Sequence, residues 1–281
     1  MMKRFGLLFL LVFISGFSLV QGQENADSLA FQRFLDYAKR EKIVRKKTGE
    51  RIVSIAKFFM DTPYVGSTLE AEGPERLQVN FRELDCTTFV ETVLALHHVL
   101  KEHKPDYEKY KQILTSIRYR NGIIEGYPSR LHYTTDWLFE NQRKGFFVFV
   151  NMGFGSETFK PQVGFMSAHP DSYTALKEHP EYVEDMAKHE KRINTLSLNY
   201  LPKEKLTSKA SFIHTGDIIT ITTSFKGLDF SHLGFALREK GVIYLLHASS
   251  TGHKVLISTQ NLKEYLSDIK KHTGIVVVRP L

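Results

Sequence analysis

The two halves of this 281-residue chain carry different hydrophobic periods, and this change constrains the fold more than any other feature. Up to about residue 117, apolar residues recur every three or four positions, which is typical of helices that bury one face. From residue 217 onward, short runs of alternating apolar and polar residues are separated by turn signals, which is typical of an antiparallel sheet. Helices first and strands later predict an α+β fold.

The individual elements follow from these periods. Helices are expected over residues 26–42, 49–60, 89–100 and 107–117, with a charged helical stretch over about 170–195 and a short helix over 262–269. Strands are expected from residue 146 (FFVFV) and then at 217–222, 231–238, 242–249, 254–258 and 274–280. No repeat or Pro/Gly-rich linker divides the chain. We therefore expect a single domain over residues 23–281, with a helical insertion at about 146–200.

The first 22 residues have the pattern of a secretory signal peptide. Lys3 and Arg4 form a basic head, residues 6–20 are mostly apolar, and residues 20–22 (VQG) fit a cleavage site. An uncleaved membrane anchor is the competing interpretation, but the apolar run falls short of the roughly 20 residues that a span needs. We therefore expect an exported protein, most simply periplasmic, without a membrane span after cleavage.

Charge and cysteine content exclude several classes of protein. The formal net charge is +7 and falls by two when Lys3 and Arg4 are removed with the leader. A moderate basic excess suits an anionic partner such as cell-wall material, or only aids solubility. No arginine-rich stripe with interleaved aromatic residues is present, so a nucleic-acid partner is not expected. Cys86 is the only cysteine, and no HExxH motif occurs, so neither a disulfide scaffold nor a metal or other cofactor is expected.

Cys86 lies where a helix is expected to begin. Asp85 is a good N-cap that can accept from the free backbone N–H groups of the next turn, which places Cys86 at the first helical position. There the helix dipole favours a thiolate, which would be alkylated well below the usual thiol pKa of about 8.5. Cys86 shares a helical face with Val90 and Val93, so the thiol should point toward whatever the helix packs on. A capped core helix that starts with a small apolar residue is the competing interpretation.

Two of the 12 histidines, His232 and His247, lie on expected strands that a short turn joins. Alternation puts His232, Gly234 and Ala236 on one strand face, and such small residues can let a helix come close. A two- or four-residue turn would make the histidines neighbours on one face, whereas a three-residue turn would separate them. In the catalytic hypothesis Cys86 attacks a carbonyl carbon, His232 carries its proton to the leaving amine, and His247 fixes the tautomer of His232. The backbone N–H of Cys86 and a nearby hydroxyl would stabilise the oxyanion.

Several motifs resemble the NlpC/p60 superfamily of papain-like cell-wall hydrolases. The superfamily resemblance lies in LDCTTFVE (84–91), GDIITIT (216–222), SHLGFAL (231–237) and LLHASS (245–250). TPYVGSTLE (62–70), the DCTTFVE run, SRLHYTTDW (129–137) and SHLGFALR are similar to one branch of it. That branch consists of N-acetylmuramoyl-L-alanine amidases that act on small muropeptides and prefer the 1,6-anhydro sugar. The resemblance runs from about Thr62 to the C-terminus and implies a papain-like fold, with N-terminal helices packed on an antiparallel sheet.

The resemblance also implies roles for particular residues. Cys86 would be the nucleophile, His232 the base and His247 the third member. A further set would line the active site or shape the sugar or peptide pocket: Tyr64, Arg130, His132, Tyr133 and Trp137. For the tryptophan and tyrosine, simple packing in a helix turn is the competing interpretation. The chain has no recognisable wall-binding repeat, and its insertion is long, which both fit a soluble muropeptide better than the intact wall.

We therefore expect an exported cysteine amidase that cuts the amide between the lactyl group of N-acetylmuramic acid and L-alanine, through a thioester and without a cofactor. Its partners would be peptidoglycan fragments. Three alternatives stay open. One is an endopeptidase that cuts between D-glutamate and the diamino acid of the stem peptide. The others are a non-catalytic muropeptide-binding protein and a metal-dependent hydrolase, which a chelator would inactivate.

Overall fold

The computed structural model describes residues 25–150, 155–207 and 210–281. The predicted leader, residues 1–22, lies outside these ranges. Among the described residues, no helix is both long enough and apolar enough to cross a membrane.

The described residues form the mixed α+β arrangement that the hydrophobic periods predict. The α-helices are residues 25–40, α2 (Thr48–Phe58), α3 (Cys86–Val99), α4 (Tyr107–Arg118), α5 (Thr134–Arg143), α6 (Phe165–Ala168), α7 (Thr174–Glu178), α8 (Glu181–Ile193) and α9 (Leu262–Asp268). Short 3-10 helices are η1 (Ile43–Arg45), η2 (Arg120–Gly122), η3 (Tyr127–Ser129), η4 (Pro170–Ser172) and η5 (Lys203–Lys205). The strands are β1 (Phe147–Phe149), β2 (Glu157–Phe159), β3 (Leu198–Pro202), β4 (Ile218–Thr223), β5 (Phe230–Glu239), β6 (Val242–Ser249), β7 (Lys254–Asn261) and β8 (His272–Pro280).

The strands of the described residues form one antiparallel sheet in the order β2-β3-β8-β4-β5-β6-β7, and β1 also pairs with β8. Strands β4 to β7 follow one another as hairpins, whereas β8 returns to pair with β4. The β5–β6 turn consists of Lys240 and Gly241, both with positive φ (49° and 83°), which suits a two-residue hairpin turn. This is the short-turn case in which His232 and His247 share a face.

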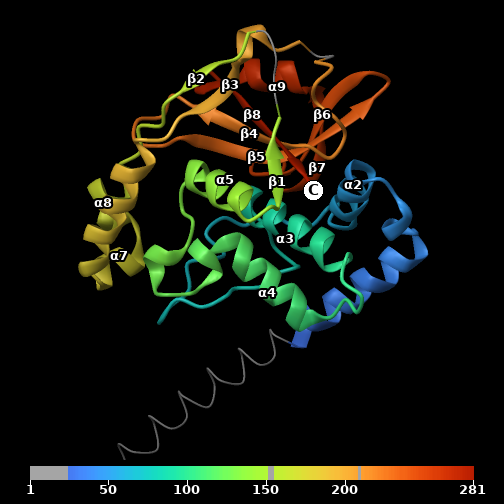
Figure 1. Ribbon diagram of the computed structural model, residues 1–281, viewed down its shortest axis with the longest axis horizontal. Coiled ribbons are helices and arrows are strands. Elements are labelled where there is room, and N and C mark those ends of the chain that lie inside the picture. The colour runs from blue at the N-terminus through green and yellow to red at the C-terminus, as the bar shows by residue number, and fades with distance from the viewer. Residues whose placement is uncertain (1–24, 151–154, 208–209) are drawn as a thin grey trace, which may run out of the picture.

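Helices cover both faces of this sheet (Figure 1). On one face, α3 packs against β5, and the rings of Phe89 and Phe235 have centroids 5.6 Å apart. On the other face, Ala236 packs with Leu262 and Leu266 of α9. The N-terminal helices therefore form one apolar layer with the sheet, and α9 closes the opposite side.

Helix α5 was not expected from the sequence, and the reason is a cap supplied from far along the chain. Tyr133 is its N-cap residue but provides no side-chain hydrogen bond. Instead, the Thr135 backbone N–H donates to Asp229 Oδ2 at 2.7 Å. A cap that comes from 94 residues away leaves no local signal in the sequence.

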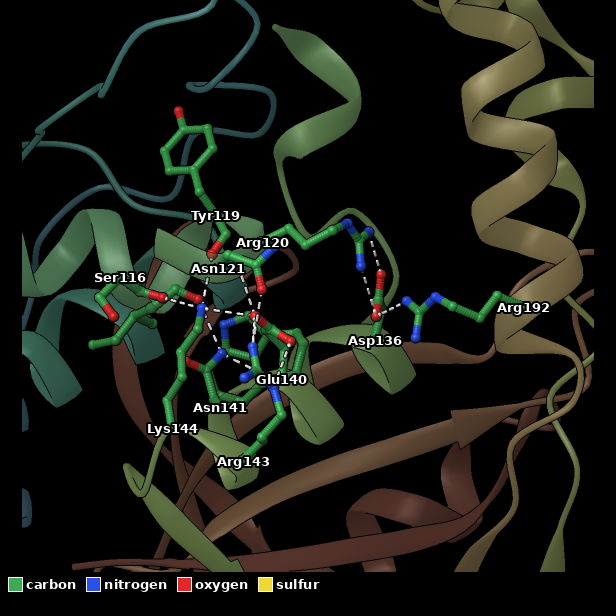
Figure 2. Close-up of polar contacts among 12 residues, drawn as sticks. Ser116, Tyr119, Arg120, Asn121, Asp136, Glu140, Asn141, Arg143, Lys144 and Arg192 are labelled. Atoms are coloured by element: carbon green, nitrogen blue, oxygen red, sulfur yellow. Dashed lines mark hydrogen bonds and ion pairs between the residues drawn. The ribbon is translucent and has the colours of Figure 1, made fainter. Parts of the chain in front are cut away.

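The insertion at about 146–200 contributes strands as well as helices. Strands β1, β2 and β3 join the sheet beyond β8, while α7 and α8 lie at the side of the molecule (Figure 1). The helical stretch predicted over residues 170–195 is divided into α7 and α8 at Pro180, because proline is tolerated at a helix start but not in its interior. The buried carboxylate of Asp136 in α5 holds α8 in place. It binds Arg120 at 2.6 Å and also contacts Arg192 of α8 (Figure 2).

Candidate active site

Cys86 occupies the first position of α3, as the sequence predicts. Asp85 caps the helix, because its Oδ1 accepts from the Thr88 backbone N–H at 2.7 Å. In return, the Asp85 backbone N–H donates to Thr88 Oγ1 at 2.9 Å. This capping box fixes the direction in which the helix begins, and with it the position of the thiol.

His232 and His247 are hydrogen-bonded, with His232 Nε2 2.6 Å from His247 Nδ1. Their rings are perpendicular, with centroids 4.8 Å apart. Gly234 makes room for this pair, because a Cβ added there would lie 2.9 Å from His247 Cβ. The small-residue face of β5 therefore accommodates an imidazole. A helix does approach this face, but it is α9, whose Leu262 and Leu266 pack with Ala236, whereas the helix that carries Cys86 packs on the opposite face.

A bulge in β5 directly precedes His232. In the pairing with β4, His232 lies opposite Ile221, whereas Phe230 lies opposite the next residue, Thr222. Ser231 is the extra residue in this register. Bulges change the direction of nearby side chains and are frequent beside active sites.

Cys86 and His232 line the same pocket, which has a volume of about 170 Å³. Its walls come from the start of α3, from residues 132–134, from Met166 of α6 and from residues 228–233. Segments that are far apart in the sequence thus meet at the thiol. A volume of this size holds a few atoms around a scissile bond rather than a whole ligand.

Burial keeps both candidate catalytic groups neutral near neutral pH. It raises the pKa of the Cys86 thiol to about 12, with a smaller contribution from the Asp85 carboxylate, while the Leu233 backbone and the Thr87 side chain act in the opposite direction. Burial also lowers the pKa of His232 to about 3. Burial therefore opposes the expected thiolate at Cys86, because desolvation disfavours the charge that the helix start favours.

His247 is neutral for the same reason, since burial lowers its pKa to about 4. If His232 donates its Nε2–H to His247 Nδ1, then His232 Nδ1 carries a free lone pair. That tautomer is the one in which His232 can accept a proton on the side away from His247.

The other predicted site residues divide into two groups. His132 and Tyr133 line the catalytic pocket. Arg130 is buried away from it and binds Glu70 at 2.6 Å and the Leu69 carbonyl at 2.8 Å. Arg130 therefore holds the loop around residue 70 rather than facing the thiol.

Trp137 lies in the apolar core, where its ring packs against Phe147 with centroids 5.2 Å apart. The structure does not bring it to the pocket, which agrees with the packing interpretation. Tyr64 lies next to the start of α3, because the chain beside it pairs with Leu84 through hydrogen bonds from Leu84 N to Pro63 O and from Val65 N to Leu84 O. Burial raises the pKa of Tyr64 to about 12, with a further contribution from Cys86, so its hydroxyl stays protonated.

Two residues that the sequence analysis missed, Tyr265 and His272, complete an aromatic cluster behind the histidine pair. The Tyr265 ring of α9 lies 5.3 Å from that of His247 and 6.2 Å from that of His232. It also stacks on His272, at 5.9 Å. Burial raises the pKa of Tyr265 to about 12, and Cys86 contributes in the same direction. No local motif marks these residues, because α9 and β8 meet the site only in the folded chain.

Asp229 and Glu190 are buried carboxylates that build the pocket walls. Asp229 lines the pocket, and burial raises its pKa. Glu190 of α8 accepts from the Tyr133 hydroxyl at 2.6 Å and from the Met166 and Ser167 backbone N–H groups at 3.1 Å. Because Tyr133 and Met166 line the pocket, the insertion holds one wall of the catalytic site.

Among the described residues, no group of three or more His, Cys, Asp or Glu side chains is arranged to hold a metal ion. The fold and the pocket together are those of a hydrolase-like α+β protein, and the comparisons with known proteins agree. Residues 54–275 match a family model described as N-acetylmuramoyl-L-alanine amidase-like. Because this match covers most of the chain, the protein belongs to the N-acetylmuramoyl-L-alanine amidase-like family.

Solved structures support this assignment. An N-acetylmuramoyl-L-alanine amidase from Bacteroides uniformis ATCC 8492 is 41% identical, with a TM-score of 0.80, over 84% of this chain and 100% of that chain. A protein from Bacteroides fragilis, provisionally described as a xylanase, is 42% identical, with a TM-score of 0.77, over 80% of this chain and 99% of that chain. A Legionella pneumophila protein shares the fold at 24% identity, with a TM-score of 0.68, over 93% of this chain and 96% of that chain. No curated protein matched.

Proposed function

We propose that this protein is an exported cysteine amidase that cleaves the bond between N-acetylmuramic acid and L-alanine in muropeptides, with the 1,6-anhydro sugar as its preferred form. The observation that carries the proposal is the 2.6 Å His232–His247 hydrogen bond beside a pocket that His232 shares with Cys86. Family membership favours an amide as the bond that is cleaved. Cys86 can act as the nucleophile, His232 as the base and His247 as the group that orients the base. The sequence motifs favour a place in the NlpC/p60 superfamily, and the first 22 residues favour export.

The proposed reaction begins with a neutral pair. As Cys86 Sγ attacks the lactyl carbonyl carbon, its proton passes to Nδ1 of His232, and the S–C bond forms. The C–N bond then breaks, and His232 returns the proton to the leaving amine of L-alanine. Water attacks the thioester with His232 as base, which releases the muramic acid carboxylate and restores the thiol.

The negative charge that develops on the carbonyl oxygen needs donors. The backbone N–H of Cys86 at the helix start is one, because Asp85 accepts from Thr88 and leaves the first N–H groups free for a ligand. We assign the second to the Tyr64 hydroxyl. Its raised pKa keeps the hydroxyl protonated and able to donate.

The pocket favours this reaction over glycoside hydrolysis. A glycosidase, which the Bacteroides fragilis relative's name suggests, uses two carboxyl groups on either side of the scissile bond. Among the described residues that line the catalytic pocket, Asp229 is the only carboxylate. The endopeptidase and the non-catalytic binding protein would use the same pocket, so product analysis must separate them.

The test is to incubate the mature protein with a defined anhydro-muramyl tetrapeptide and to weigh the products. We expect a free anhydro sugar and an intact tetrapeptide, and we expect Cys86→Ala to lose turnover by several orders of magnitude while it keeps its folded circular dichroism spectrum. Iodoacetamide should inactivate the enzyme, and a chelator should not. A muramyl dipeptide with a released dipeptide would instead show the endopeptidase. If wild type and Cys86→Ala both bind the substrate and neither cleaves it, the non-catalytic binding function would be favoured.

A further inference from the structure

A second, larger cavity of about 810 Å³ lies beside the catalytic pocket. The inserted segment forms one wall and the β4–β5 connection the other, and we call this cavity the insertion groove. Its main lining side chains are Phe159, Lys160, Phe165, Phe225, Lys226 and Leu228. Leu228 also lines the catalytic pocket, and Phe165 directly precedes Met166, which lines it too. The two cavities therefore adjoin at Leu228, which places the groove next to a substrate held at Cys86.

Hydrogen bonds hold the walls of the insertion groove in place. Within the inserted wall, Asn194 Oδ1 accepts from the Val163 backbone N–H and Asn194 Nδ2 donates to the Val163 carbonyl, each at 2.8 Å. The Gly227 carbonyl accepts from the N–H groups of Gly164 and Phe165, each at 3.2 Å. The groove is therefore preformed, and its volume falls in the range of sites that hold small ligands.

The groove joins apolar surface to positive charge. Phe225 is 48% exposed, and its ring lies 6.2 Å from that of Phe165, so the two form an apolar surface in the groove. Lys160 and Lys226 are exposed, and neither has a carboxylate partner within the described residues. The described residues that line the groove include no Asp or Glu. Such a surface attracts an anionic ligand with apolar groups.

We propose that the insertion groove binds the carboxylate-bearing stem peptide of the muropeptide, an inference that rests on the proposed amidase function. In a muropeptide the lactyl carboxyl is already part of the scissile amide, so the sugar carries no charge. The stem peptide carries the D-glutamate carboxylate and its own C-terminal carboxylate. Lys160 and Lys226 therefore complement the peptide side of the substrate, and the phenylalanines take its alkyl chains.

The experiment compares paired substrates that differ only in charge: anhydro-muramyl peptides with a free D-glutamate carboxylate or with its amide. We expect wild type to prefer the free carboxylate in kcat/KM, mainly through KM. Lys160→Gln and Lys226→Gln should each reduce this preference by about two- to fivefold at low salt, as exposed ion pairs do. High salt should reduce it in wild type as well. Lys57→Gln, an exposed lysine on α2, is the matched control and should leave the preference unchanged.

Titration of Cys86→Ala with the free stem peptides and their amides tests binding without turnover. Weaker binding of the carboxylate form in the double lysine variant supports the inference, even if the cleaved bond proves to be another one. An equal preference in wild type and the double variant overturns the inference and leaves the amidase function intact. The inference is also overturned if Phe225→Ala lowers the affinity for the sugar part of the substrate and leaves the preference for the peptide carboxylate unchanged. The sugar, and not the peptide, would then occupy the groove.

Discussion

At the scale of single residues, the chemistry of the pocket is set by how strongly burial disfavours charge. The start of α3 favours a thiolate at Cys86, yet desolvation raises the pKa of this thiol to about 12. Burial lowers the pKa of His232 to about 3, so the imidazole is neutral and can act as a base. In the proposed mechanism, charge develops only when the sulfur attacks, beside the N–H groups of the helix start. The residue type and its helical position are visible in the sequence, but the degree of burial is not.

The pH dependence of alkylation tests this balance at Cys86. We expect iodoacetamide to label the native protein slowly at neutral pH and faster only as the pH rises above about 8.5, because the thiolate is the reactive form. Labelling of Cys86 is followed by mass spectrometry, and the same reaction in denaturant is the control, with an ordinary thiol titration. The opposite result is fast labelling of the native protein at a rate that stays constant as the pH falls below about 7. It would show that the helix start and His232 stabilise the thiolate more than burial disfavours it.

At the scale of elements, ion pairs and caps from distant segments fix the helices around the site. Beneath α3, Glu91 binds Arg118 of α4 at 2.7 Å, and both side chains are buried. Lys144, directly after α5, donates to the carbonyl of Ser116 near the end of α4 at 2.6 Å and lies 3.3 Å from Glu140 of α5 (Figure 2). These contacts hold α3, α4 and α5 in one layer, and α3 carries Cys86, the proposed nucleophile. Their sequence separation is the reason why the local pattern predicts the helices but not how they dock.

His98, on the same helix, provides a stability test for α3. Its ring packs edge-on against Phe146 with centroids 4.9 Å apart, and burial lowers its pKa to about 3. The unfolded chain takes up a proton near pH of about 6.5, but the native state does not, so stability is lost as the pH falls below that value. His98→Phe removes this loss. The difference in free energy of unfolding between His98→Phe and wild type should grow in favour of the variant by about 2 kcal/mol as the pH falls from about 7.5 to about 5.

Urea unfolding of both proteins at the two pH values measures this difference. A stability difference between His98→Phe and wild type that stays constant with pH would contradict the prediction. It would mean that His98 is protonated as readily in the native protein as in the unfolded chain.

At the scale of the whole molecule, the inserted segment completes the candidate active site. Its strands extend the sheet, Asp136 holds α8 against α5 through Arg192, and Glu190 of α8 holds the α6 turn and Tyr133 at the pocket. Both the catalytic pocket and the insertion groove lie where the insertion meets the β4–β5 connection. The insertion is thus a wall of the site and not an appendage.

Glu190→Gln tests this role. The amide cannot replace a carboxylate that accepts from three or more donors, so we expect a loss of about 1.5 to 3 kcal/mol in stability. Amide hydrogen exchange should rise at residues 165–168, and KM should rise more than kcat falls. Lys188→Gln on the exposed face of α8 is the control and should change stability by less than about 1 kcal/mol. Exchange that rises uniformly along the chain would show a general loss of stability rather than a local anchor.

The sequence by itself determined the class of fold, the start of α3 at Cys86 and the β5–β6 hairpin, whereas the length of its turn, and with it the pairing of His232 with His247, came from the structure. The first three follow from local patterns: a cap, a hydrophobic period or a short turn. Only the tertiary structure decided that Tyr265, His272 and Asp229 join the site and that Trp137 and Arg130 lie away from the pocket. It also decided how strongly burial opposes the expected thiolate. These outcomes depend on contacts between segments that are far apart in the chain, and on the exclusion of water that such contacts produce, which no local pattern records.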